Sequence, residues 1–280
     1  MSDARVTLSR PELAPFEYEG ISRAIAYDEL RLTQSTVGVA AILASANSSA
    51  EQVSQLLYGE RFDILRRDGA FVWGQSRRDG YVGWVEACTL STDLVAPSHW
   101  VIASRAAVLS RPEIRAPTLE VIGMNALVVV AEVRKAFSLV DGLGWIASRQ
   151  LAPIGTGLFD PTEVAALFLG VPYVWGARDG GGLDCSGLVQ QAMFAAGQSC
   201  PRDADQQAAL GVEIAPEALA AGDLVAWKGH IGMMLDARRL IHANAHHMAV
   251  AIEPLESAIL RIAETATGRP TACRRLNLGL

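Results

Sequence analysis

The sequence predicts two small β-barrels in tandem, followed by a domain that mixes α-helices with an antiparallel sheet. Short aromatic and β-branched runs, separated by Asp-Gly turns, fill much of the first half of the chain. The pattern recurs after about sixty residues, which indicates a repeated unit. Helical periodicity begins only near residue 160, and 280 residues are enough for two or three domains.

The first barrel is expected over residues 35–95, after an N-terminal extension of residues 1–34. Its strand-like runs are residues 55–66, 70–76 and 81–85, with Asp68-Gly69 and Arg78-Asp79-Gly80 between them. Asp-Gly between two such runs is typical of a β-hairpin.

The second barrel is expected over residues 96–152. Its Gly144-Trp145-Ile146 repeats the Gly83-Trp84-Val85 of the first barrel. Two strand-like runs precede the repeated triplet, at residues 126–133 and 136–140, with Asp141-Gly142 as a turn. One continuous β-sandwich is the alternative that these patterns leave open.

Residues 153–280 are expected to form the third domain, entered through a linker over residues 151–157. Asp160 as N-cap, Pro161 at the first helical position and Glu163 at the third predict a helix that closes at Gly170. Further helices are expected over residues 185–196, 203–210 and 254–262. Four short runs predict an antiparallel meander: residues 223–228, 230–235, 240–243 and 248–252. The tail from Thr265 carries little signal.

Composition excludes some classes of function. The formal net charge is −6 and no Lys/Arg-rich block appears, so nucleic acid is not expected as a partner. No secretory signal pattern opens the chain and no apolar run reaches the roughly 20 residues that span a bilayer. We therefore expect no membrane span and a cytoplasmic location, with an extracytoplasmic location as the alternative if a leader had been removed from the given sequence. The four cysteines have no CxxC spacing, which fits reduced thiols.

Cys185 stands where a coil ends and an apolar-periodic helix begins. The first N–H groups of a helix lack internal partners and its dipole is positive there, so an anionic sulfur is stabilised and its pKa is expected to fall. This position predicts a reactive nucleophile. A small buried cysteine under a helix start is the structural alternative.

His230 and His242 are suited to serve such a nucleophile. A cysteine nucleophile needs a base for its proton, and the base needs a third group that fixes its tautomer. The two histidines are twelve residues apart, an even separation, so a hairpin turning about Asp236 places them on one sheet face. We expect the helix start with Cys185 to pack across that face.

A zinc site is the competing interpretation of the same residues, with Cys185, His230, His242 and His246 or His247 as ligands. No HExxH helix or paired cysteines frame such a site. We therefore expect neither a metal nor any other cofactor.

Several motifs occur in an order that resembles the NlpC-type cell-wall peptidases, which are papain-like cysteine hydrolases. They are Pro172-Tyr173-Val174-Trp175-Gly176, Asp184-Cys185-Ser186-Gly187-Leu188-Val189, Pro201-Arg202-Asp203, Gly222-Asp223-Leu224, Gly229-His230-Ile231-Gly232 and Ile241-His242-Ala243. The two barrels resemble bacterial SH3-like domains. With these barrels in front of the peptidase-like domain, the whole chain is similar to the γ-D-glutamyl-diamino-acid dipeptidyl peptidases that process murein peptides.

The resemblance implies a role for each matching residue. Cys185 is the nucleophile, His230 the base and His242 the third polar group, and Tyr173 lines the site near the oxyanion. Asp184 and Ser186 are expected to hold the free N-terminal amine of an L-Ala-γ-D-Glu unit. Further substrate contacts are expected from Trp175 and Asp203, and from Glu60 and Tyr81 of the first barrel. Ala204 departs from the serine frequent in relatives, so one hydrogen bond to the substrate is absent or comes from Asp203 or water.

The implied substrates are murein tripeptides or tetrapeptides that carry a free N-terminal L-Ala. Two rival functions remain open. One is a protein that binds cell-wall peptide through its SH3-like domains and has an inactive hydrolase domain. The other keeps the papain-like chemistry for acyl transfer or for a different amide.

Overall fold

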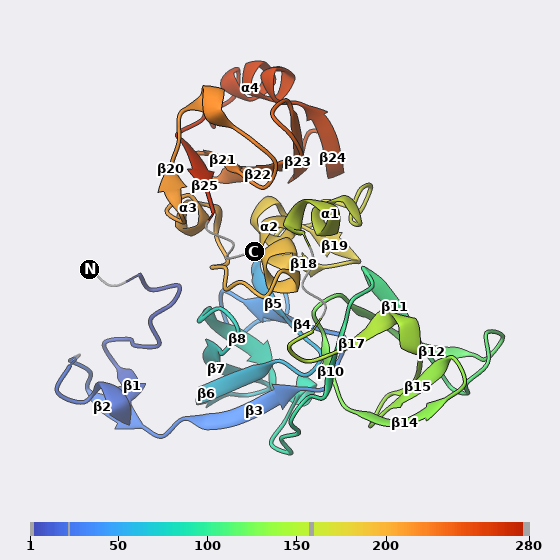
Figure 1. Ribbon diagram of the computed structural model, residues 1–280. Coiled ribbons are helices and arrows are strands. Elements are labelled where there is room, and N and C mark those ends of the chain that lie inside the picture. Colours follow the sequence, from blue (N-terminus) through green and yellow to red (C-terminus); the bar gives the residue numbers. More distant parts are fainter. Residues whose placement is uncertain (1–2, 22, 157–159, 277–280) are drawn as a thin grey trace. The chain divides into compact units, whose positions relative to one another are not determined.

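The computed structural model describes residues 3–21, 23–156 and 160–276 (Figure 1). The chain divides into two compact units, Met1–Ile154 and Gly155–Leu280. Each unit is described by itself. Gly157, the last residue of the expected linker, lies outside the described residues. In the described part of the chain, no helix combines the length and the apolar character that crossing a membrane requires.

The first barrel is an antiparallel sheet with the strand order β5-β4-β8-β7-β6-β3-β9. Its strands are β3 (Arg31–Ser35), β4 (Val39–Leu43), β5 (Gln52–Leu57), β6 (Arg61–Asp68), β7 (Phe71–Ser76), β8 (Val82–Glu86) and β9 (Leu90–Ser91). Its core contains Ile42, Leu56, Phe62 and Val85. Since β3 pairs with β6, the sheet begins at Arg31, before the expected boundary at residue 35.

The run 55–66 is two strands rather than the single strand that the sequence predicts. Gly59 lies between β5 and β6 with φ +79°, a left-handed conformation that favours glycine. A Cβ there would lie 2.1 Å from the carbonyl oxygen of Leu127. The turn therefore needs glycine for both its backbone angle and its close contact with the second barrel.

The N-terminal extension packs on the first barrel. Leu8 is buried with Trp73 and Trp84, and the Val82 N–H donates to the carbonyl of Arg5 over 2.7 Å. A short parallel pair, β1 (Leu13–Pro15) and β2 (Ala26–Asp28), follows.

The second barrel repeats the strand order of the first. Its five-stranded sheet runs β12-β11-β16-β15-β14, as β5-β4-β8-β7-β6 does in the first barrel. The repeated Gly-Trp pair lies on β8 in one sheet and on β16 in the other. The strands are β10 (His99–Val101), β11 (Arg105–Leu109), β12 (Thr118–Gly123), β13 (Leu127–Val128), β14 (Val130–Arg134), β15 (Phe137–Val140), β16 (Gly144–Ala147) and β17 (Leu151–Pro153). Each barrel has its own buried core, so the continuous sandwich is wrong.

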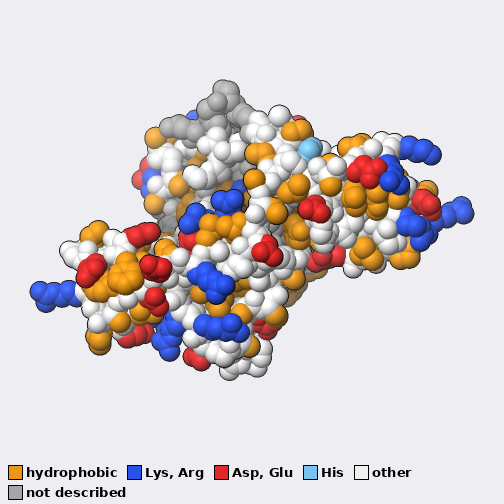
Figure 2. Space-filling view, turned by 90° about the horizontal axis from the view of Figure 1, so that it is seen from below, with side chains coloured by type: hydrophobic (Ala, Val, Ile, Leu, Met, Phe, Trp, Pro, Cys, Tyr) orange, Lys and Arg blue, Asp and Glu red, His pale blue; other side chains and the backbone are white. Residues whose placement is uncertain are grey.

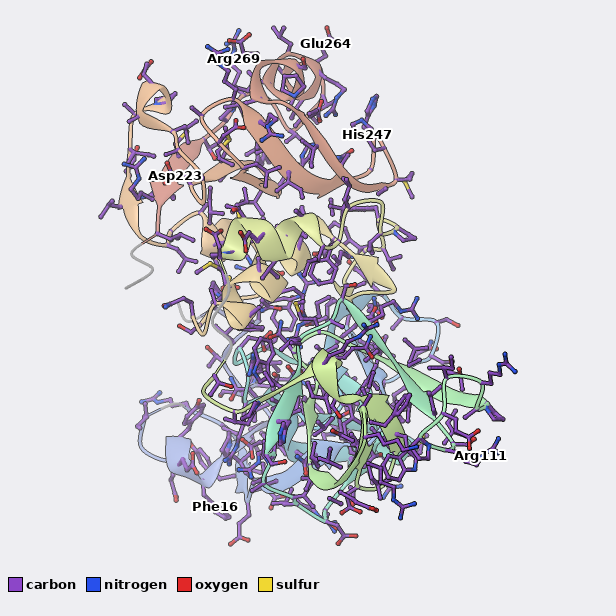
Figure 3. The ribbon with its side chains drawn as sticks, turned by 45° about the vertical axis from the view of Figure 1, so that its right-hand side comes forward. Phe16, Arg111, Asp223, His247, Glu264 and Arg269 are labelled. Carbon is purple, nitrogen blue, oxygen red and sulfur yellow. The ribbon has the colours of Figure 1, made fainter. Side chains whose placement is uncertain are left out.

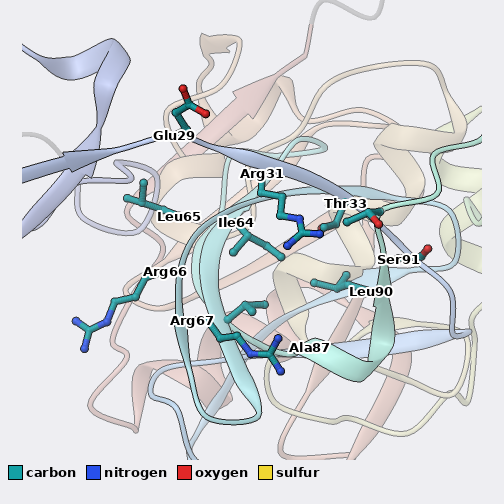
Figure 4. Close-up of a pocket in the computed structure, with 12 residues that line it drawn as sticks. Glu29, Arg31, Thr33, Ile64, Leu65, Arg66, Arg67, Ala87, Leu90 and Ser91 are labelled. Atoms are coloured by element: carbon teal, nitrogen blue, oxygen red, sulfur yellow. The ribbon is translucent and has the colours of Figure 1, made fainter.

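The surface of the first unit carries mixed charge. On the face seen in Figure 2, basic side chains are interspersed with acidic and apolar ones. A pocket of about 460 Å³ on the first barrel is lined by Arg31, Arg66 and Arg67 together with Glu29 and apolar side chains (Figure 4).

The second unit is a six-stranded sheet between helices, with the order β20-β25-β21-β22-β23-β24. Its strands are β20 (Val212–Glu213), β21 (Leu224–Trp227), β22 (His230–Met234), β23 (Arg239–Asn244), β24 (Ala249–Pro254) and β25 (Ala272–Arg275), besides a small hairpin of β18 (Arg178–Asp179) and β19 (Gly182–Leu183). The meander from β21 to β24 is as predicted, whereas β25 was not predicted. The sheet has α4 (Leu255–Ala263) on one face and α1 (Pro161–Ala166) and α2 (Cys185–Ala195) on the other, and α3 (Ala204–Gln207) follows α2 (Figure 1).

Candidate active site

Cys185 is the first residue of α2, as predicted. The Asp184 side chain caps this helix and accepts the Gly187 N–H over 2.7 Å. Gly187 has no room for a side chain, because a Cβ there would lie 2.3 Å from the carbonyl oxygen of Ala177. Every residue of α2 is buried, so the core of the unit fixes the start of the helix and the cysteine on it.

Arg202, to which the sequence motif assigned no role of its own, is buried and contacts the two residues that flank Cys185. Arg202 Nη2 is 2.5 Å from Asp184 Oδ2 and Nη1 is 3.0 Å from Oδ1, which makes a bidentate ion pair. Arg202 Nη1 also donates to Ser186 Oγ over 2.8 Å. Both residues expected to bind the substrate amine are therefore held by one guanidinium. Their role toward substrate stays a prediction, while the N-cap role of Asp184 is confirmed.

His230 and His242 share one sheet face and contact each other, as the even separation predicts. His230 Nε2 lies 2.8 Å from His242 Nδ1. His242 is fully buried, and its Nε2 lies 2.7 Å from Glu253 Oε1 on the neighbouring strand. Since His242 pairs with Ala251, Glu253 is its diagonal neighbour on the same face. Glu253 in turn contacts Arg261 of α4. The sequence reasoning missed Glu253, because nothing marks an acidic residue at a strand end.

The hydrogen bonds fix the tautomers of both imidazoles. Burial raises the pKa of Glu253, but the hydrogen bonds and charges of His242 and Arg261 lower it further, so the net shift is downward and the carboxylate is ionised. A carboxylate only accepts, so His242 Nε2 carries the proton and Nδ1 accepts from His230 Nε2. The lone pair of His230 is then on Nδ1, which is the atom that can take a proton from Cys185.

The Cys185 sulfur contacts β22 at the end where that strand is not paired with β23. β22 and β23 pair at Met233↔Ile241 and Met234↔Leu240. Nearer His230, the Ile231 N–H donates to the Cys185 sulfur instead. Leu240, on the histidine face, belongs to the core beneath α4, whereas α2 lies on the other side (Figure 1). The expectation that the helix packs across the histidine face is therefore wrong, and the approach of the Cys185 sulfur to His230 stays a prediction.

Burial dominates the protonation of the pair. Burial, with a smaller contribution from the charge of Asp184, raises the pKa of Cys185 to about 12. The N–H groups of Ile231 and Ser186 and the charge of Arg202 lower this pKa, but by less. Burial also lowers the pKa of His230 to about 3, with His242 and Arg261 adding to it. The expected fall in the pKa of the thiol is wrong, because desolvation outweighs the helix N-terminus. The resting pair is a neutral thiol and a neutral imidazole.

Tyr173 is held near Cys185 and Asp184 by its backbone. Its N–H donates to the carbonyl of Met248 over 2.9 Å, and burial, together with Cys185 and Asp184, raises the pKa of its hydroxyl. Tyr173 is therefore a neutral donor. Trp175 is 58% exposed, and Asp203 caps α3 in a capping box with Gln206. Their substrate contacts stay predictions.

Glu60 and Tyr81 are buried within the first unit. The Glu60 carboxylate accepts the Leu57 N–H over 3.0 Å, and Tyr81 belongs to the core of the first barrel. These contacts give both residues a structural role in the barrel. Their expected contact with substrate stays a prediction.

A cysteine at a buried helix start and a histidine whose tautomer is fixed by a second polar group define a papain-like cysteine peptidase. The second unit contains an NlpC/P60 family domain, since the model of that family matches residues 170–266. A second model, the bacterial dipeptidyl-peptidase Sh3 domain, matches residues 42–90.

Relatives with curated names extend the similarity beyond the catalytic unit. The chain is 29% identical to gamma-D-glutamyl-L-lysine dipeptidyl-peptidase of Bacillus subtilis, over 74% of this chain and 77% of the relative. It is 25% identical to dipeptidyl-peptidase 6 of Lysinibacillus sphaericus, over 78% and 89%. The crystal structure of an NlpC/P60 family protein from Bacillus cereus has the same fold, with a TM-score of 0.72, 18% identity and coverage of 87% and 99%.

Proposed function

We propose that the protein hydrolyses the γ-D-glutamyl–diamino-acid bond of murein peptides that carry a free N-terminal L-Ala. The observation that carries this proposal is the similarity to dipeptidyl peptidases of that name, which spans most of the chain. The arrangement of Cys185, His230, His242 and Glu253 supports it, since it supplies a nucleophile, a base and the groups that orient the base.

The first half of the reaction forms an acyl-enzyme. His230 Nδ1 takes the thiol proton of Cys185 while the sulfur attacks the γ-carbonyl carbon of D-Glu. The Cys185 N–H at the helix start stabilises the oxyanion, with the Tyr173 hydroxyl as a second donor. The tetrahedral intermediate collapses, His230 gives the proton to the amine of the diamino acid, and that amine leaves.

The second half releases the dipeptide. His230 takes a proton from water, whose oxygen attacks the thioester carbon, and the sulfur departs and regains its proton. The product is L-Ala-γ-D-Glu with a free carboxylate. His242 and Glu253 stabilise the imidazolium that forms in each half. The reaction uses no cofactor.

The test is hydrolysis of L-Ala-γ-D-Glu-L-Lys and of its diaminopimelate analogue, followed by separation of the products. We expect release of the diamino acid by the native chain and none by Cys185→Ala. The N-acetylated tripeptide is the matched control, and we expect it to be cleaved far more slowly. Equal cleavage of both peptides would exclude an amine pocket at Asp184 and Ser186.

The same experiment separates the two rival functions. A peptide-binding protein with an inactive hydrolase domain binds the tripeptide but releases no product. An acyltransferase consumes the tripeptide and joins its dipeptide to an added amine rather than to water. The cytoplasmic location remains part of the proposal, and cell fractionation tests it.

A further inference from the structure

We propose that His242, His247 and Glu253 form a binding site for Zn²⁺, and that the bound ion inhibits the peptidase. Each residue offers one ligand atom, and the three atoms lie within 4.8 Å of one another. Two imidazoles and a carboxylate are a ligand set that zinc accepts. The group differs from the zinc site considered from the sequence, since it contains neither Cys185 nor His230.

His247 is prepared for metal binding by its neighbour. It lies in the turn between β23 and β24, on the side of the sheet that carries α4 (Figure 3). Its Nδ1 is 2.9 Å from Asn244 Oδ1, and its backbone N–H donates to the same oxygen over 2.8 Å. When Nδ1–H donates to an amide oxygen, the lone pair is on Nε2. Metal-binding histidines usually have such a second hydrogen bond.

The dimensions of the group are close to those of a zinc site. Zinc bonds of 2.0–2.1 Å in a tetrahedron place ligand atoms about 3.3 Å apart. His242 Nε2 and Glu253 Oε1 are already 2.7 Å apart and need to separate only slightly. His247 is exposed and can move inward from solvent. Water completes the coordination on that open side.

Zinc at this site would reverse the hydrogen bond between the two histidines. Metal on His242 Nε2 displaces the proton there, so the neutral ring carries its proton on Nδ1 and donates to His230 Nε2. His230 must then carry its own proton on Nδ1, the atom that accepts the thiol proton. One proton leaves His242 Nε2 for solvent, the proton of His230 Nε2 moves to His242 Nδ1, and His230 Nδ1 gains one proton from solvent. The two rings together therefore still carry two protons. His230, however, no longer has a lone pair that can accept the thiol proton of Cys185.

Arg261 opposes the ion. Its guanidinium contacts Glu253 and repels a cation placed there. This repulsion weakens binding, and it predicts that Arg261→Gln binds Zn²⁺ more tightly than the native chain.

The binding experiment uses Cys185→Ala in the full chain, which removes the thiol as a competing ligand. Zn²⁺ is titrated calorimetrically, and Co²⁺ is added separately to read the coordination geometry from its visible spectrum. We expect one ion per chain and a tetrahedral spectrum. His247→Gln in the same background should weaken binding at least about tenfold, whereas His246→Gln, the adjacent exposed histidine, should not. Binding that disappears in Cys185→Ala, or that survives His247→Gln unchanged, would overturn the site.

The inhibition experiment rests on the proposed peptidase function, whereas the binding experiment does not. We expect Zn²⁺ to inhibit the native chain, a chelator to restore activity, and His247→Gln to need at least about tenfold more Zn²⁺ for the same inhibition. If the ion binds at His247 but the native and His247→Gln chains are inhibited equally, the regulatory claim is wrong. If no substrate is cleaved, the proposed function fails while the metal site can still be judged by binding.

Discussion

His230 donates from Nε2 to Nδ1 of His242 over 2.8 Å, and this single contact decides which nitrogen of His230 keeps a free lone pair. His242 can accept only because Glu253 takes the proton on its other nitrogen. The orientation of the base thus depends on a carboxylate two residues removed from it in the hydrogen-bond chain.

Replacing His242 should impair turnover more than binding. His242→Ala removes the acceptor that fixes His230, so we expect kcat to fall about 10²-fold or more, with KM changed little. His242→Gln is the matched variant, because its amide oxygen can still accept from His230, and it should retain more activity. Steady-state kinetics on the tripeptide checks both. Equal losses in the two variants would show that the hydrogen bond is not what matters.

Glu253 should act as a positioning residue. In Glu253→Gln the amide oxygen can still accept from His242 Nε2, but the charge that stabilises the imidazolium is lost. We expect kcat to fall about tenfold, and Glu253→Leu to fall further. Because Glu253 raises the pKa of His242 against burial, both variants should also shift the acid limb of the rate profile to lower pH. If the acid limb of the rate profile stays at the same pH in both variants, Glu253 has a purely structural role.

The value of kcat/KM should stay high at a lower pH than an enzyme with a solvent-exposed catalytic histidine would allow. The site is active with both imidazoles neutral, so protonation of either ring ends activity, and burial lowers the pKa of His242 to about 4. Burial lowers the pKa of His230 to about 3, well below the ordinary value of 6.5. The acid limb of kcat/KM should therefore lie far below pH 6.5. An acid limb near pH 6.5 would mean that the ring is solvated in the working enzyme.

The same burial makes stability depend on pH. The pKa of His242 is lowered to about 4 and that of His230 to about 3, so between pH 6.5 and 4 the unfolded chain binds more protons than the folded chain. The stability is fully present above pH 6.5 and is lost as pH falls, at up to about 1.4 kcal/mol per pH unit for each histidine. Hydrogen exchange of β22 and β23 amides measures this. A His230→Gln/His242→Gln double variant should show a flatter dependence.

Replacing Arg202 should lower the free energy of unfolding. Arg202→Met leaves the buried Asp184 carboxylate without its guanidinium, and we expect a loss of about 3–5 kcal/mol. Asp184→Asn in the same chain removes the uncompensated charge and should recover part of the loss. Urea denaturation of the single and double variants tests the coupling. Additive losses would contradict it.

The sequence predicted the parts of the molecule that depend on local patterns. The repeated Gly-Trp pair indicated two barrels, and the even spacing of His230 and His242 indicated a shared face. Cys185 was placed at a helix start by the apolar periodicity that follows it. Features that depend on contacts between distant segments were not predicted. β25 pairs with β21, a strand more than forty residues earlier in the chain. Arg202 and Glu253 likewise contact residues that are far from them in the sequence. The pKa of Cys185 was misjudged because burial is a property of the folded core.

The most direct test of the account is to trap the acyl-enzyme. The native chain is mixed with L-Ala-γ-D-Glu-L-Lys, quenched in acid within the first turnover and digested for mass spectrometry. We predict a dipeptide joined as a thioester to Cys185, with the lysine released, and no adduct in Cys185→Ala. Turnover of the tripeptide by Cys185→Ala, or a dipeptide carried on another residue, would contradict the assignment of the nucleophile.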